Sequence, residues 1–190
     1  NSRLEQGAIG IASLGYAVPG TVIAVGVLIP IAWLDNQIDF LSRTWFDYPT
    51  GLLLSGTLGI LVFAYLVRFL SIALNTVDSG LISIKPNLDE SARSLGASPS
   101  KVLRRIHLPI LRTSLLTALL LVFVEVLKEL PTTLILRPFN FNTLAVRTYE
   151  LASDERLMDA ALPALAIVII GLLPVLLITK SILKERLTND

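Results

Sequence analysis

Four long apolar runs restrict this chain to one broad kind of fold. They cover approximately Ala8–Trp33, Gly51–Leu74, Ile110–Leu136 and Ala160–Ile178. Each run is long enough for an α-helix to cross a bilayer, which takes roughly 20 residues. Only 16% of the 190 residues are charged, whereas ordinary soluble domains have about 25%. One small soluble core cannot bury so many apolar residues, so the runs predict an all-α, polytopic membrane protein with four spans.

Residues inside the first two runs bear on how the spans pack. Gly15, Pro19 and Gly20 interrupt the first run. Glycine and proline are common in membrane helices, but here they would also permit a kink and a close helix contact. Arg68 lies toward the later end of the second run, where we expect its side chain to extend to the lipid headgroups.

The composition bears on several classes of function. Cysteine is absent, which rules out a disulfide framework, a thiolate metal site and a thiol redox motif in these 190 residues. The sequence has no Gly-x-x-x-x-Gly-Lys-Ser/Thr loop for holding ATP phosphates. We find no Ser/His/Asp, Cys/His or metal-ligand cluster, and a net charge of +1 does not indicate nucleic-acid binding. The chain is therefore predicted to be no enzyme and to hold no metal or cofactor of its own.

A polar segment, residues 88–109, separates the second and third runs and reads LDESARSLGASPSKVLRRIHLP. Gly96 predicts a break between two short helices, because glycine adopts left-handed backbone angles without steric cost. Ser98 and Pro99 predict the start of the second helix, as its N-cap and first residue. We expect that helix to end against Leu108 and Pro109. So much local order in a loop predicts that another molecule docks on it.

The basic residues predict the orientation in the membrane. The loop Asn75–Arg112 carries six of them, whereas the linker Asp35–Thr50 carries only Arg43. Since basic loops stay on the cytoplasmic side, this loop and both ends of the chain are predicted to be cytoplasmic. Asp35–Thr50 and Arg137–Asp159 then face outward. In the second of these, Asn142 or Thr143 is expected to cap a short amphipathic helix that runs through Leu151.

The polar segment resembles the EAA loop of ABC importer permeases. The family pattern is Glu-Ala-Ala, three residues, Gly, nine residues, Ile, one residue, Leu-Pro. The matching residues here are Glu90, Ser91, Ala92, Gly96, Ile106, Leu108 and Pro109. Only Ser91 departs from the pattern, where alanine is usual. The resemblance implies a MetI-like helical bundle in which residues 1–190 form a permease domain that is incomplete at its N-terminus, with residues 78–109 as the cytoplasmic coupling loop.

In that family the coupling loop seats on a separate ATP-binding cassette ATPase, which binds the ATP. Arg93, Lys101 and Arg104 would offer charged contacts to it, beside the residues that match the pattern. The alternative is an amphipathic loop that lies on the membrane surface. A secondary transporter or channel fragment without an ATPase is the competing class of function, and a membrane-embedded enzyme is a third.

Two flanking stretches, GYAVPGTVIAVG and KELPTTLILRPFNFNTLAVRTYELASDERLMDAALPAL, resemble the ferric-iron permeases that work with a periplasmic binding protein. Those permeases are often double-length, and this chain is most similar to the C-terminal half. The resemblance implies a bacterial inner-membrane protein, surrounded by lipid, whose partners are the ATPase, the periplasmic binding protein and a second permease half. It implies ferric iron as the solute. Similar permeases carry thiamine, phosphonate, sulfate or polyamine.

Three charged residues near the end of the third run are candidates for the translocation path. Glu125 and Glu129 are four residues apart and would share one helix face, with Lys128 beside it. Charges in a membrane span tend to face a cavity or to pair with one another. They could line the path, or Glu125 and Lys128 could form an internal pair that packs the helix. Farther out, Arg137, Arg147, Glu150, Asp154 and Glu155 could meet the binding protein by charge complementarity, or could be solvated.

Overall fold

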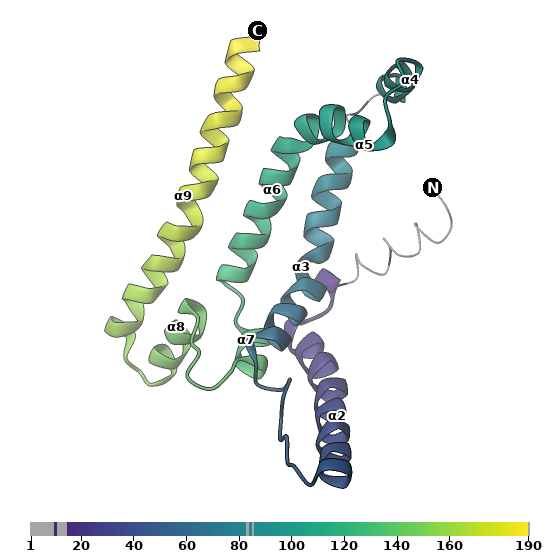
Figure 1. Ribbon diagram of the computed structural model, residues 1–190. Helices are drawn as coiled ribbons and strands as arrows, with labels where there is room; N and C mark the ends of the chain where they lie inside the picture. Colours follow the sequence, from purple (N-terminus) through teal and green to yellow (C-terminus); the bar gives the residue numbers. More distant parts are fainter. Residues whose placement is uncertain (1–9, 11–14, 83, 85, 190) are drawn as a thin grey trace.

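The computed structural model describes residue 10 and residues 15–82, 84 and 86–189, and every regular element within these ranges is a helix (Figure 1). The helices are α2 (Gly20–Phe46), α3 (Leu58–Leu81), α4 (Pro86–Ser94), α5 (Pro99–Val102), the π-helical turn η1 (Leu103–His107), α6 (Leu108–Leu127), α7 (Pro131–Leu136), α8 (Leu144–Ser153) and α9 (Leu157–Asn189).

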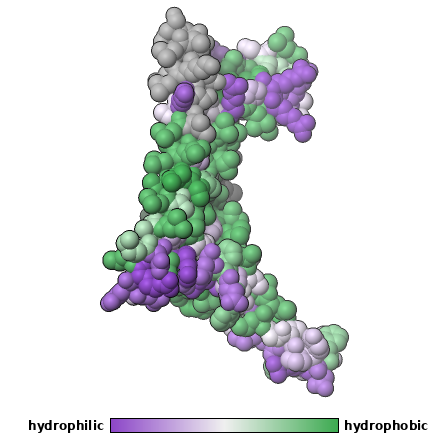
Figure 2. All heavy atoms as spheres, turned by 90° about the vertical axis from the view of Figure 1, so that its left-hand side faces the viewer, coloured by the Kyte–Doolittle hydropathy of each residue, from purple (hydrophilic) through white to green (hydrophobic). Residues whose placement is uncertain are grey.

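Within the described residues, four helical segments are long and apolar enough to cross a membrane: Gly20–Phe46, Leu58–Leu81, Pro99–Leu127 and Leu157–Leu176. The predicted all-α, four-span membrane protein is therefore confirmed. Figure 2 shows the matching surface, with a mostly hydrophobic band across the middle and hydrophilic patches above and below it. Only 6–28% of each span's most apolar stretch is buried within the chain, so most of this surface is left for lipid or for other protein segments.

The first span ends later than predicted and the second begins later, whereas the predicted start of the first span at Ala8 lies outside the described residues. Helix α2 continues to Phe46, so residues 35–46 are helical and the prediction of a linker that begins at Asp35 is wrong for them. The second span begins at Leu58 rather than at Gly51. The reason is the tertiary role of Asp35, which is fully buried. Its carboxylate accepts backbone hydrogen bonds from Leu53, Leu54 and Ser55 at 3.2, 2.9 and 2.7 Å.

Together, the second half of α2 and the loop 47–57 form an outer hairpin that extends beyond the other spans (Figure 1). Asp39 supports the same loop one turn farther on, since it accepts from the backbone N–H of Gly51 at 2.9 Å. Arg43 pairs with Asp39 at 2.7 Å. Aspartates at this spacing satisfy backbone groups of the loop, so they fold it back along α2.

The third predicted span is not one continuous helix. Helix α6 ends at Leu127, residues 128–130 are not helical, and α7 begins with Pro131. Proline has no N–H to bond to the carbonyl four residues earlier, and its ring clashes with that carbonyl. Here the carbonyl belongs to Leu127, the last residue of α6, so the helix stops at that point.

Helix α8 begins where the sequence predicts. Thr143 is its N-cap, and the side-chain oxygen accepts from the backbone N–H of Val146 at 3.3 Å. Helix α9 packs on α8 and contacts α6 along part of its length, at the left-hand edge of Figure 1. The fourth span therefore joins the rest through α8 and α6.

The largest cluster of buried apolar side chains joins α2, α3 and α7. It consists of Ile23, Ala24, Ile60, Leu61, Ala64 and Leu136. Helices α3 and α6 pack closely at Gly80, where an added Cβ would lie 2.7 Å from the Cβ of Ser114. The chain is thus held together in two places, an outer core around α2 and α7 and an α3–α6 crossing nearer the polar segment.

Candidate functional site

The first half of the predicted coupling loop ends in a Schellman motif. The N–H of Gly96 bonds to the carbonyl of Arg93 at 2.9 Å, and the N–H of Ala97 bonds to that of Ala92 at 3.0 Å. Gly96 has a φ of +75°, which a residue with a Cβ adopts only under strain. The prediction of two short helices separated at Gly96 is therefore confirmed.

The second half differs from the prediction in two respects. Ser98 occupies the N-cap position of α5, but its hydroxyl caps no backbone N–H. The helix does not end at Leu108 and Pro109, because α5, η1 and α6 follow one another without a loop. Pro109 has no N–H for α-helical bonding, and the N–H of Leu108 bonds to Leu103, one residue beyond the α-helical partner. In Figure 1, α5 lies across the upper end of the spans, and the chain then turns downward into α6.

Most residues that match the EAA pattern lie on the surface. Glu90, Ser91, Gly96, Leu108 and Pro109 are exposed, as are the basic residues Arg93, Lys101 and Arg104, whereas Ala92 is buried and Ile106 is half-buried. Leu95 is 87% exposed. The residues of the pattern lie on consecutive elements, from α4 through α5 and η1 to the start of α6.

The three path candidates do not act as one group. Glu125 and Lys128 form an ion pair at 2.7 Å, and the hydroxyl of Tyr16 donates to Glu125 at 3.4 Å. The Glu125–Lys128 contact is the internal pair that the sequence left open as an alternative. Lys128 is more than half exposed.

Glu129 faces another way, because it lies beyond the end of α6. Its Oε2 is 3.2 Å from Nε of Arg68, and the two side chains are 6% and 16% exposed. The expectation that Arg68 extends to the headgroups is therefore wrong, and so is the expectation that Glu125 and Glu129 share a helix face. A buried arginine next to a buried carboxylate is more stable as a pair than either charge alone in an apolar surrounding.

Hydrogen bonds to other groups surround this ion pair. Glu129 accepts from the backbone N–H of Thr132 at 3.0 Å, and the hydroxyl of Thr132 donates to the carbonyl of Gly20 at 3.2 Å. The hydroxyls of Tyr65 and Thr133 are 2.5 Å apart. This network was not predicted from the sequence. The available signal was the opposite charge of Arg68 and Glu129 in two neighbouring apolar runs.

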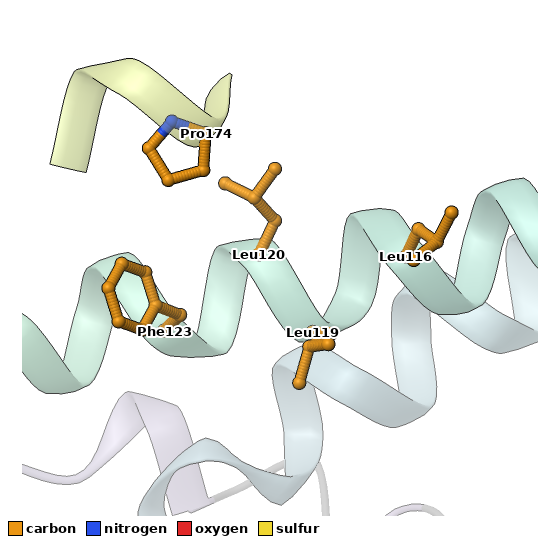
Figure 3. A pocket seen from close by; sticks show the side chains of 5 residues that line it. All are labelled: Leu116, Leu119, Leu120, Phe123 and Pro174. Carbon is orange, nitrogen blue, oxygen red and sulfur yellow. The ribbon is translucent and has the colours of Figure 1, made fainter. Parts of the chain in front are cut away.

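The described residues offer neither a metal-binding cluster nor, in the pocket between α6 and α9, a polar binding site. In the part of the chain that the structure describes, no three His, Cys, Asp or Glu residues are grouped so that they could hold a metal ion. An open pocket between α6 and α9 is lined only by apolar side chains, namely Leu116, Leu119, Leu120, Phe123 and Pro174 (Figure 3). Leu120 points toward Pro174 across it. Such a lining offers no hydrogen bond to a polar solute.

Around α8, at the end of the molecule away from the predicted coupling loop, several of the charged residues pair with one another. Arg137 donates to Glu150 at 2.9 Å and also contacts Asn142, and Arg147 lies 3.6 Å from Glu150. Asp154 and Glu155 are exposed. Phe139, which lines the same pocket as Arg137, Asn142 and Glu150, is 100% exposed. This surface therefore combines a paired charge cluster with an exposed aromatic ring.

Comparison with known families agrees with the membrane architecture. Residues 1–185 match the family described as the binding-protein-dependent transport system inner membrane component. The match covers both the predicted coupling loop and the Arg68–Glu129 pair.

Three relatives show how far the similarity extends. The Fe(3+)-transport system permease protein FbpB 2 of Haemophilus influenzae is 29% identical over 87% of this chain and 29% of its own length. The putative 2-aminoethylphosphonate transport system permease protein PhnV of Salmonella typhimurium is 32% identical over 92% of this chain and 59% of its own. The ferric transport system permease protein FbpB of Actinobacillus pleuropneumoniae is 27% identical over 76% and 20%. The chain therefore spans only part of the length of the curated relatives that it matches.

Proposed function

The chain belongs to the family of binding-protein-dependent transport system inner membrane components, and from this premise we propose that it is the transmembrane permease subunit of an ATP-driven importer. A separate ATPase would bind and hydrolyse ATP, and a periplasmic binding protein would deliver the solute. The membrane helices would then expose the path to either side in turn. The relatives are themselves transport permeases, which supports a transport role rather than an enzymatic one.

The observation that carries the proposal is the form of the predicted coupling loop. Helix α4 stands outside the spans and ends at Ser94, just before the turn at Gly96, while α5 and η1 continue directly into α6. A push on α5 would therefore reach α6 through continuous helical structure. The predicted coupling loop exposes an apolar side chain, Leu95, and charges of both signs, among them Glu90 and Arg93, which a protein partner could complement.

The same proposal sets the orientation. The predicted coupling loop and both ends of the chain would be cytoplasmic, because the basic residues gather there. The outer hairpin and α8 would face the periplasm of a bacterial inner membrane. Four spans with so little buried surface do not enclose a path, so a second permease half, fused or separate, would complete it.

We propose ferric iron as the solute. Support comes from relatives named as ferric permeases, at 27–29% identity. The second candidate is 2-aminoethylphosphonate, which is favoured by the 32% identity and higher coverage of the PhnV relative. Because Glu125 and Glu129 each have a basic partner, this chain would provide a path for the solute, and selection would rest with the binding protein.

Co-purification tests the role of the loop. Glu90→Arg should reduce retention of the ATPase by the full-length permease, because it reverses an exposed charge on α4. Gly96→Val should do the same, because valine is strained at a φ of +75°. Asp154→Arg, on the opposite side of the molecule, is the matched control and should retain the ATPase. Equal retention by all three variants would contradict docking at the loop.

Uptake measurements test the solute. Cells that express the permease with its ATPase and binding protein should accumulate radiolabelled ferric iron, and a variant with an inactive ATPase should not. An excess of 2-aminoethylphosphonate should leave iron uptake unchanged. ATP-dependent uptake of the phosphonate instead of iron would establish the second candidate.

A further inference from the structure

Two interruptions of helical structure lie side by side in this chain. The first is at Val18 and Pro19, just before α2, and the second is at residues 128–130, between α6 and α7. They meet where the hydroxyl of Thr132 bonds to the carbonyl of Gly20. Interrupted helices leave backbone groups without helical partners, and within a membrane protein those groups need partners from elsewhere.

Arg68 supplies a donor at the first interruption. In a continuous helix the carbonyl of Val18 would accept from the N–H of Val22, but that N–H bonds to the carbonyl of Pro19 at 3.0 Å. The guanidinium Nη1 of Arg68 donates to the carbonyl of Val18 at 3.4 Å. The side chain therefore serves a backbone acceptor that α2 itself does not satisfy.

Glu129 supplies an acceptor at the second interruption. The N–H of Thr132 lies in the first turn of α7, where no helical carbonyl can reach it, and it donates to Oε1 of Glu129 at 3.0 Å. The other carboxylate oxygen lies 3.2 Å from Nε of Arg68. One buried ion pair thus joins Arg68, which donates to the carbonyl of Val18 before α2, to Glu129, which accepts from the N–H of Thr132 at the start of α7.

We propose that Arg68 and Glu129 are positioning residues that join the two interruptions, so that α2, α7 and the first turns of α3 form one block. The outer core supports this division, because its members lie on α2, α3 and α7 and not on α6. Helix α6 packs instead on the later turns of α3, where Gly80 lies against Leu111 and Ser114.

Because of these backbone hydrogen bonds, Arg68 and Glu129 cannot exchange positions without loss. An exchanged pair, Arg68→Glu with Glu129→Arg, keeps opposite charges in contact. However, a glutamate at 68 cannot donate to the carbonyl of Val18, and an arginine at 129 cannot accept from the N–H of Thr132. The exchanged pair should therefore fail to restore the block.

Cysteine labelling of the full-length permease in detergent tests the proposal, with any cysteines outside this chain removed. Ala24→Cys reports on the block, because Ala24 is 0% exposed in the outer core, and Ala118→Cys reports on buried α6 outside it. Arg68→Met, Glu129→Gln and the exchanged pair should each speed maleimide labelling at position 24 by roughly tenfold or more, since each leaves a buried group unsatisfied. Labelling at position 118 should change by less than about twofold.

Arg43→Met is the matched control, because it breaks an arginine–aspartate pair whose arginine is 61% exposed. It should change neither reporter. Wild-type labelling in the exchanged pair would overturn the proposal, because charge alone would then suffice. Faster labelling at both reporters in Glu129→Gln, which keeps an acceptor for Thr132, would also overturn it. The assay needs neither ATPase nor solute, so a permease that imports nothing but shows the expected labelling would refute only the proposed function.

Discussion

At the scale of single residues, Gly20 shows how closely the chain packs around the buried ion pair. A Cβ at this position would lie 2.5 Å from Nη1 of Arg68, 2.7 Å from Oγ1 of Thr132 and 2.8 Å from Oε1 of Glu129. Gly26, two turns along the same helix, would meet nothing within 4 Å. The two glycines therefore have different physical roles, although the sequence presents both simply as glycines in an apolar run.

We predict opposite effects of alanine at these two glycines. Gly20→Ala should lower the free energy of unfolding by about 1–3 kcal/mol, because the added methyl group overpacks a filled site. Gly26→Ala should leave it unchanged or raise it by up to about 1 kcal/mol, because alanine is the better helix former. Thermal unfolding of the purified permease in detergent would measure both. Equal effects at the two positions would contradict the packing around Gly20.

At the scale of elements, the outer hairpin depends on carboxylates rather than on a large apolar core. Asp35 is fully buried and bonds to three consecutive backbone N–H groups of the loop. Asp39 makes one such bond and is 21% exposed. Exposed aromatic residues lie on the same element, with Trp45 and Phe46 each 76% exposed. The hairpin is thus a stiffened projection with an aromatic end.

Asp35→Asn should loosen this hairpin. The amide NH₂ would face a backbone N–H, so at least one buried donor would lose its acceptor at a cost of about 1–3 kcal/mol. Asp39→Asn should cost less, because water reaches that carboxylate. Limited proteolysis within residues 47–57 would show faster cleavage for the first variant. Similar cleavage of the two variants would show that Asp35 does not hold the loop.

At the scale of the whole molecule, polar surfaces lie at the two ends of a mostly apolar band (Figure 2). The predicted coupling loop lies at one end, with Leu95 87% exposed, and the α7–α8 connection lies at the other, with Phe139 100% exposed. Connections at opposite ends of a spanning bundle face different compartments. The proposed orientation assigns the cytoplasm to Leu95 and the periplasm to Phe139.

Single cysteines would test that orientation directly. The described chain contains no cysteine of its own, so Phe139→Cys and Leu95→Cys each introduce one thiol into it. A membrane-impermeant maleimide applied to spheroplasts should label position 139 at once and position 95 only after the membrane is opened. The reverse pattern would invert the topology.

Local chemistry explains which predictions from sequence were correct. The four apolar runs predict four spans because the bilayer sets a minimum helix length. The break at Gly96 and the cap at Thr143 depend on residues only a few positions away, so they too can be read from sequence. The segment around Gly96, residues 90–109, matches the EAA pattern. That match predicted the permease family, whose model matches residues 1–185.

By itself, then, the sequence determined the number of spans, the helix break at Gly96 and the family. Only the tertiary structure decided that Arg68 is buried against Glu129, that Glu125 and Glu129 face different ways, and that α2 continues past Asp35. These outcomes depend on partners that are distant in the chain, such as Thr132 and Gly20, 112 residues apart. No local pattern specifies which distant group satisfies a buried charge, because that is settled only when the helices pack.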